Sequence, residues 1–118
     1  MQRPAARPRL DRVRSSASIA KLAVQQLEDE LGDPVDPELL AGLLRELFDE
    51  ACPQDGLFGA LSQLLTMASR VAVLAPLDGE DAESAACAIE EAAAYIGDSA
   101  GMRLHLATST LHPQGERA

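Results

Sequence analysis

The sequence has no tryptophan, one tyrosine and two phenylalanines, so aromatic residues make up only 3% of its 118 positions. Alternating runs of β-branched residues, which are typical of strands, are almost absent. An aromatic core is therefore excluded, and a sheet is disfavoured. Alanine and leucine are abundant instead, and hydrophobic residues reach 47% of the chain. This composition predicts a single all-α domain whose helices pack closely.

Cysteine is scarce as well, and Cys52 and Cys87 are the only two. The disulfide framework that stabilises many small secreted domains needs more cysteines than this. The first residues show neither a signal peptide nor a lipid-anchor motif. We therefore expect a cytoplasmic protein in which both cysteines are free thiols. Arginine outnumbers lysine nine to one, which is typical of a GC-rich, bacterial genome.

The longest apolar stretch runs from residue 56 to residue 75, and Arg70 is its only charged residue. Its apolar residues recur at steps of four and three, namely Leu57, Leu61, Leu64, Ala68, Val71 and Ala75. This spacing places them on one face of a helix, and the scarcity of charge predicts that this helix is the buried centre of the fold. Leu64→Ala is then expected to cost about 2–5 kcal/mol of stability. A membrane span is the alternative, and the central arginine disfavours it.

The opposite side of this helix is small and mildly polar. It consists of Gly59, Ser62, Thr66 and Ser69. Because such side chains occupy little space, the sequence predicts that a neighbouring helix can approach closely there.

The predicted fold is an all-α, single-domain, antiparallel bundle of four to five helices around a buried central helix. Capping residues and helix-breaking residues define where its other helices begin and end. The predicted helices span residues 8–31, 36–52, 56–75, 81–96 and 98–111. They form a bundle at residues 8–112, between a flexible Arg-rich arm at residues 1–7 and a frayed tail at residues 113–118. Asp36 followed by Pro37 is a typical helix start. Pro53 and Gly97 are expected to end the second and fourth helices.

The first predicted helix carries an apolar seam that extends over three heptads. Its members are Leu10, Val13, Ala17, Ala20, Val24, Leu27 and Leu31. Alternating steps of three and four are typical of a helix that packs lengthwise on another. The seam is about 33 Å long at 1.5 Å per residue, which is longer than the other helices need to cover it. A later start, with Ser15 or Ser16 as the cap, would leave the arginines outside the helix, and the unbroken seam favours the longer version.

The net charge of −9 is unevenly distributed. Residues 1–14 contain five arginines and one aspartate, whereas residues 15–118 contain five basic and eighteen acidic residues. The arginines are Arg3, Arg7, Arg9, Arg12 and Arg14. Such an arm can be merely solvated, can lie on the acidic helices of its own chain, or can hold a nucleic-acid backbone without reading its bases. The acidic body can also mimic nucleic acid.

Motifs for catalysis and metal binding are missing from the sequence. There is no phosphate-binding glycine loop, no nucleophile elbow and no zinc-type spacing of cysteine and histidine. His105 and His112 lie seven residues apart on one helix face, but a metal site needs further converging ligands. The segment around Glu90 and Glu91 is interpreted as a solvated acidic face, and Cys87 has no visible base nearby. The sequence therefore predicts no catalytic residue, no cofactor and no metal.

A helix-turn-helix is the DNA-binding arrangement that residues 36–75 could outline. The would-be recognition helix carries Arg70 alone, and the helix before it is acidic, so phosphates would be repelled.

The function predicted from these features is that of a small acidic helical protein–protein interaction module, non-enzymatic and self-associating, with a protein partner or a second copy of itself. Its predicted partner-binding residues are Leu10, Val13 and Ala17 with Arg3, Arg7, Arg9, Arg12 and Arg14. The alternatives are a nucleic-acid-associated or nucleic-acid-mimicking regulatory protein, which would use the Arg-rich arm or the acidic body, and an enzyme whose site the sequence does not reveal. No membrane partner is expected.

Overall fold

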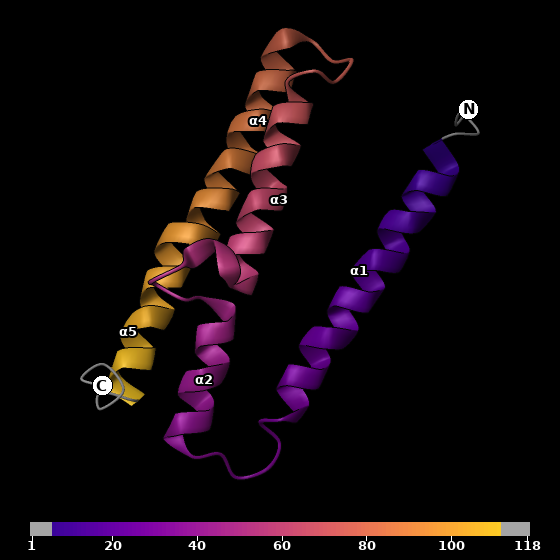
Figure 1. Ribbon diagram of the computed structural model, residues 1–118. Coiled ribbons are helices and arrows are strands. Elements are labelled where there is room, and N and C mark those ends of the chain that lie inside the picture. Colours follow the sequence, from indigo (N-terminus) through magenta and orange to yellow (C-terminus); the bar gives the residue numbers. More distant parts are fainter. Residues whose placement is uncertain (1–5, 112–118) are drawn as a thin grey trace. The chain divides into compact units, whose positions relative to one another are not determined.

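The computed structural model describes residues 6–111, and every regular element in that range is helical (Figure 1). The all-α prediction is therefore confirmed for this range. The chain divides into two compact units, residues 1–35 and residues 36–118, whereas the sequence predicted one bundle over residues 8–112. Arg3, His112 and the predicted tail at residues 113–118 lie outside the described residues.

The first unit contains one helix, α1 (Ala6–Asp29). It begins two residues before the predicted start at Pro8 and includes the arginines at positions 7–14, as the longer of the two sequence interpretations required. A turn follows, in which the amide of Gly32 donates to the carbonyl of Asp29 at 3.0 Å. Because the unit holds no second helix, the seam of α1 is not covered within it, and Val13 is 61% exposed.

The second unit is built on a long helical rod. Its elements are α2 (Pro37–Leu47), the short 3-10 turn η1 (Pro53–Asp55), α3 (Leu57–Ala72), α4 (Gly79–Ala94), the π-helical turn η2 (Tyr95–Ala100) and α5 (Gly101–Leu111). α4, η2 and α5 follow one another without a break and form the rod (Figure 1). α3 packs along α4, and α2 packs along α5. Consequently α2 and α3 lie end to end against the rod and run in the opposite direction (Figure 1).

α2 begins as its sequence predicts and ends earlier than predicted. The Asp36 carboxylate accepts a hydrogen bond from the amide of Leu39 at 2.7 Å, and Pro37 occupies the first helical position. The helix ends at Leu47, because Phe48 adopts an extended backbone with φ −146° and ψ 118°. This departure from the helix turns the Phe48 ring inward, where it is 4% exposed. A Cβ atom at Gly101 of α5 would collide with that ring, so the glycine makes room for it.

Gly97 does not end a helix, contrary to the sequence prediction. It lies inside η2, and the chain continues in helical form to Leu111. A glycine ends a helix by adopting a positive φ, and no described glycine does so. Its missing side chain serves packing instead, since a Cβ atom at Gly97 would lie 3.2 Å from the hydroxyl of Ser62 on α3. Asp98 consequently lies within the π-helical turn rather than at a helix start.

The sequence predicted that the leucine face of α3 is buried, and this prediction is wrong. The apolar face is open, with Leu57 42%, Leu61 47%, Leu64 63% and Val71 58% exposed. The small polar side faces the rod, with Ser69 buried and Ser62 half-buried. α3 is therefore not the buried central helix of the fold.

Two features explain why the polar side of α3 can pack against the rod. The buried residues of α4 are alanines, namely Ala82, Ala86 and Ala93, so both faces are small and the helices approach closely. The hydroxyls are also satisfied, because Ser69 donates to the Thr66 carbonyl at 2.7 Å and Thr66 to the Ser62 carbonyl at 2.9 Å. No buried side-chain polar atom among the described residues lacks a hydrogen bond. Burial of this face therefore leaves no uncompensated polar group.

Ser62 bridges α3 and the rod, since its hydroxyl donates to the carbonyl of Ala93 at 3.1 Å. Ser62→Ala is expected to lower the free energy of unfolding by about 1 kcal/mol, which is the typical net value of such a bond. Urea denaturation measures this change. Ser84→Ala, at an exposed position of α4, is the matched control and is expected to leave stability unchanged or slightly raised. Equal effects of the two substitutions would contradict a role for the Ser62 bond.

Candidate interaction surfaces

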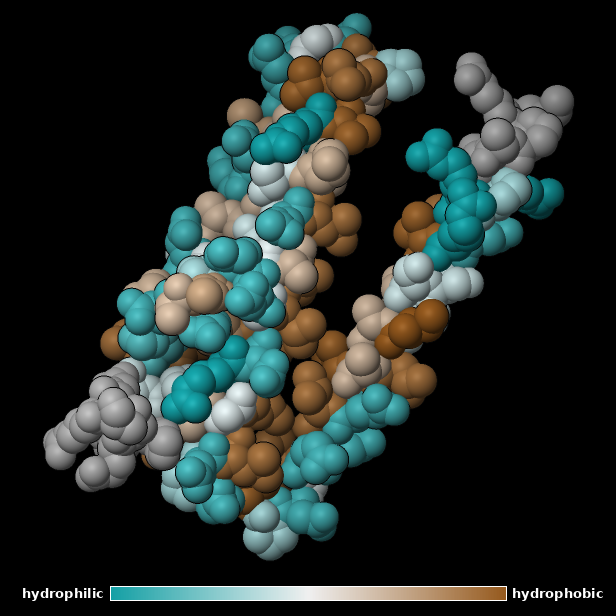
Figure 2. Space-filling view, viewed as in Figure 1, coloured by the Kyte–Doolittle hydropathy of each residue, from teal (hydrophilic) through white to brown (hydrophobic). Residues whose placement is uncertain are grey.

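An extended apolar surface of the second unit runs along α3 and just past its end at Ala72. We name it the leucine stripe and define it as Leu57, Leu61, Leu64, Ala68, Val71 and Ala75. Figure 2 shows hydrophobic residues gathered along the open side of α3, and Met67 next to the stripe is exposed as well. Single exposed leucines are common on proteins, but a contiguous apolar patch marks an interaction site. The leucine stripe is therefore a candidate interaction surface.

The seam of α1 is a second apolar surface. Leu10, Val13 and Ala17, which the sequence predicted to bind a partner, are all exposed. Val24 is exposed further along the same seam, and Leu27 is the only described residue of α1 beyond Ala6 that is half-buried. The structure therefore leaves both heptad-spaced faces of the chain without a cover in their own units.

Charge distinguishes the two units. Arg7, Arg9, Arg12 and Arg14 are exposed on the first half of α1, and Arg14 pairs with Asp11 at 3.8 Å. Residues 36–118 contain fourteen acidic and four basic residues, which gives a net charge of −10. A basic helix segment and an acidic body attract one another over a range set by salt, about 8 Å at physiological ionic strength.

A cleft of ≈ 250 Å³ lies where α3 meets η2. Phe48, Gln54, Ser62 and Asp98 contribute to its lining, and these residues come from three separate stretches of sequence. Asp98 is its only charged residue, and the lining contains neither histidine nor cysteine. The hydroxyl of Ser62 donates to the Ala93 carbonyl and has no histidine beside it in the lining, and Asp98 alone does not make a set of metal ligands. Sequence reasoning missed it because its parts are brought together only by the packing of α3 on the rod.

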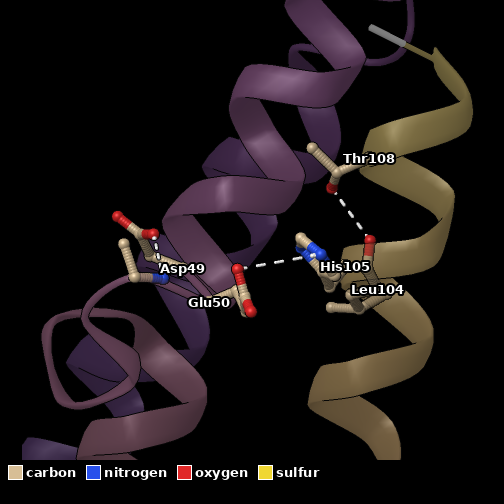
Figure 3. A network of polar contacts seen from close by, with 6 residues as sticks. Asp49, Glu50, Leu104, His105 and Thr108 are labelled. Carbon is tan, nitrogen blue, oxygen red and sulfur yellow. Dashed lines mark hydrogen bonds and ion pairs between the residues drawn. The ribbon is translucent and has the colours of Figure 1, made fainter. Parts of the chain in front are cut away.

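His105, which the sequence singled out as a candidate metal ligand, takes part in a polar cluster between α5 and the segment after α2 (Figure 3). Its Nε2 atom lies 3.8 Å from a carboxylate oxygen of Glu50, an ion pair when the histidine is protonated. Nearby, Asp49 accepts a hydrogen bond from the amide of Ala51 at 3.0 Å, and Thr108 donates to the carbonyl of Leu104 at 2.8 Å. Within residues 6–111, no three histidine, cysteine or acidic side chains converge as a metal site would require. The His105–Glu50 pair is the contact of this cluster that joins α5 to the segment after α2.

Both cysteines are free thiols with exposed side chains, as the sequence predicted. Among the described residues, no helix is both long enough and apolar enough to cross a bilayer. α3, the stretch for which a membrane span was considered, has only 16 residues.

Comparison of the chain with protein-family models, with curated proteins and with solved structures found no match.

Proposed function

We propose that the protein is a small, acidic, helical protein–protein interaction module, non-enzymatic and cytoplasmic, that self-associates through α1. The observation that carries the proposal is the exposure of two heptad-spaced apolar faces on one chain, the seam of α1 and the leucine stripe. Faces of this spacing are typical of helices that pack lengthwise on other helices.

The two kinds of residue on α1 have different roles in this proposal. Leu10, Val13 and Ala17 supply most of the affinity, because burial of apolar surface contributes about 25 cal/mol per Å². The arginines of the arm contribute mainly orientation and rate of association, since an exposed ion pair is worth about 0–1 kcal/mol. Association should therefore weaken with salt without being abolished.

Sedimentation equilibrium at moderate and at high salt tests the proposal. The wild-type chain is expected to dimerise, and a chain that lacks residues 1–14 is expected to dimerise more weakly, because it loses Leu10, Val13 and the arginines together. Val13→Glu should weaken the dimer in the same way, since it places a charge in the seam. Ser15→Glu introduces the same charge on the opposite side of α1 and is the matched control. A wild-type chain that stays monomeric at high micromolar concentration would overturn the proposal.

A second candidate is the binding of a nucleic-acid backbone by α1, which is favoured by the four exposed arginines at positions 7–14. At about 100° per residue, Arg7 and Arg14 share one side of the helix, whereas Arg9 and Arg12 point elsewhere. A phosphate-binding helix usually gathers its basic residues on one face, which makes this the weaker candidate. Retention of the protein on DNA that decreases steeply with salt would support it.

A further inference from the structure

We propose that the leucine stripe of one copy is covered by α1 of a second copy, with the two helices parallel, and that the second stripe is covered by α1 of the first. The inference rests on the proposed self-association and identifies the surface that receives α1. Three independent features of the chain lead to it: the register of the two apolar faces, the distribution of charge along them, and the reach of the segment that joins α1 to α2.

The register of the two faces matches over four turns. A constant offset of 44 residues brings every seam position from Val13 to Leu27 level with a position of the leucine stripe, from Leu57 to Val71. Along this alignment Ala17 and Ala20 lie opposite Leu61 and Leu64, and Val24 lies opposite Ala68. At these three middle positions a large residue meets a small one, which fills the space between two helices. At the two ends Val13 meets Leu57 and Leu27 meets Val71.

The charges along the two helices favour the parallel direction. In the parallel alignment, the arginine-rich first half of α1 comes to the end of α3 near Asp55. The acidic end of α1, with Glu28 and Asp29, comes to the end of α3 that carries Arg70. The antiparallel alignment that brings the two faces level, from Val13 with Ala75 to Leu31 with Leu57, takes the arginines to the end of α3 that carries Arg70. It also places Asp33 opposite Asp55. Like charges in such positions destabilise a helix pair.

The joining segment is too short for the parallel arrangement within one chain. Parallel alignment puts the end of α1 at the far end of α3, whereas the chain must continue into Pro37 at the start of α2. Since α2 and α3, with 11 and 16 residues, lie end to end, these two points are about 40 Å apart at 1.5 Å per residue. The eight steps from Asp29 to Pro37 span at most about 29 Å when fully extended. A parallel α1 on the leucine stripe must therefore come from a second copy.

A two-fold axis accommodates both contacts at once. The start of α2 in each copy must lie near the end of α3 in the other, and two rods that run in opposite directions satisfy this condition for both copies together. The resulting interface is the same on both chains and closes after two copies. Both apolar faces of each chain are then covered, and none is left for further growth.

Disulfide trapping between two different variants tests the proposed register. Both variants carry Cys52→Ala and Cys87→Ala, which are substitutions at exposed positions. One also carries Ala17→Cys and the other Leu61→Cys. Mixing and mild oxidation are expected to give the covalent heterodimer as the main product, because these positions face each other within the Cα separation of about 4.4–6.8 Å that a disulfide requires.

The matched control replaces Leu61→Cys by Met67→Cys, which is also exposed on α3. Met67 lies about 9 Å further along the helix and outside the leucine stripe, so trapping should be slow. A faster reaction with Met67→Cys than with Leu61→Cys would overturn the parallel register. Ala17 and Val71 face each other in the antiparallel alignment, and Val71 is exposed. A disulfide formed within a single chain that carries both Ala17→Cys and Val71→Cys would overturn the exchange between copies.

Sedimentation separates failure of this inference from failure of the proposed function. Leu64→Glu is expected to raise the dissociation constant about a hundredfold, because it buries an unpaired carboxylate against Ala20 of the second copy. Gln63→Glu adds the same charge one residue outside the stripe and should leave the dissociation constant nearly unchanged. If Val13→Glu disrupts the dimer and Leu64→Glu does not, self-association stands and the leucine stripe is not its receiver. A monomeric wild type would overturn both.

Discussion

Phe48→Ala is expected to lower the free energy of unfolding by about 3–5 kcal/mol, the range found for truncation of a buried phenylalanine. Among residues 6–111, Phe48 is the largest of the five buried hydrophobic residues, and the other four are alanines. Its ring lies against Gly101. Because glycine has no side chain, position 101 offers nothing that could move into the cavity left by the missing ring. Denaturation by urea, measured at protein concentrations too low for association, gives the change directly.

Two variants serve as controls for Phe48. Phe48→Leu keeps most of the buried volume and should cost less than half as much. Leu64→Ala also truncates a large side chain, but at a position that is 63% exposed. We therefore expect it to leave the stability of the isolated chain nearly unchanged. A costly Leu64→Ala together with a mild Phe48→Ala would restore the buried central helix that the sequence predicted.

Gly59→Ala is expected to destabilise the protein by about 1–3 kcal/mol, although alanine is the better helix former. A Cβ atom at position 59 would collide with the carbonyl oxygen of Pro53 and would lie 2.7 Å from the Cα atom of Gln54. Both are backbone atoms of η1, so the strain cannot be relieved by rotation of a side chain. The substitution should therefore move η1 away from α3, and thermal or urea denaturation measures the loss.

The control for Gly59 is the same substitution at Gly42 in α2, where a Cβ atom would have no neighbour within 4 Å. Gly42→Ala should stabilise the protein by about 0.5–1 kcal/mol, because it removes the conformational freedom of glycine from the unfolded chain. The two substitutions are thus expected to have opposite signs. A stabilising Gly59→Ala would mean that α3 and η1 do not pack as closely as described.

Periodicity in the sequence predicted the helices and the membership of each face. The expected close approach of a helix to the small side of α3 is confirmed, whereas the expected burial of its leucine side is wrong. Leu57, Leu61 and Leu64 share a side of α3 as expected. Whether that side meets the rod depends on the partner, and α4 offers a row of alanines that suits the small side better. The sequence does show that the small side of α3 and the alanine row of α4 have side chains of similar, small size, and this match indicates their contact. Hydroxyls that bond within their own helix made the polar side cheaper to bury than its composition suggested.

The end of α4 was mispredicted for a related reason. Glycine is the usual residue at a helix C-terminus, yet its effect depends on a backbone conformation that the packing must also favour. Close approach of Ser62 keeps Gly97 within the rod. The candidate surfaces were predicted in part: the seam of α1 is exposed with the predicted residues on it, whereas the leucine stripe was assigned to the interior.

The π-helical turn η2 allows the rod to contain one residue more than a uniform α-helix with the same packing would. Buried residues of the rod follow one another at intervals of seven, eight and seven, from Ala86 to Ala93, Gly101 and Thr108. In a uniform α-helix an interval of eight would turn the following residues about 80° away from their partner, and a π turn absorbs the additional residue. η2 is thus a one-residue insertion that the rod accommodates without rotating α5 away from α2. Related chains that differ in length by one residue should carry the difference here, because at other positions of the rod it would bring the wrong face against α2 or α3.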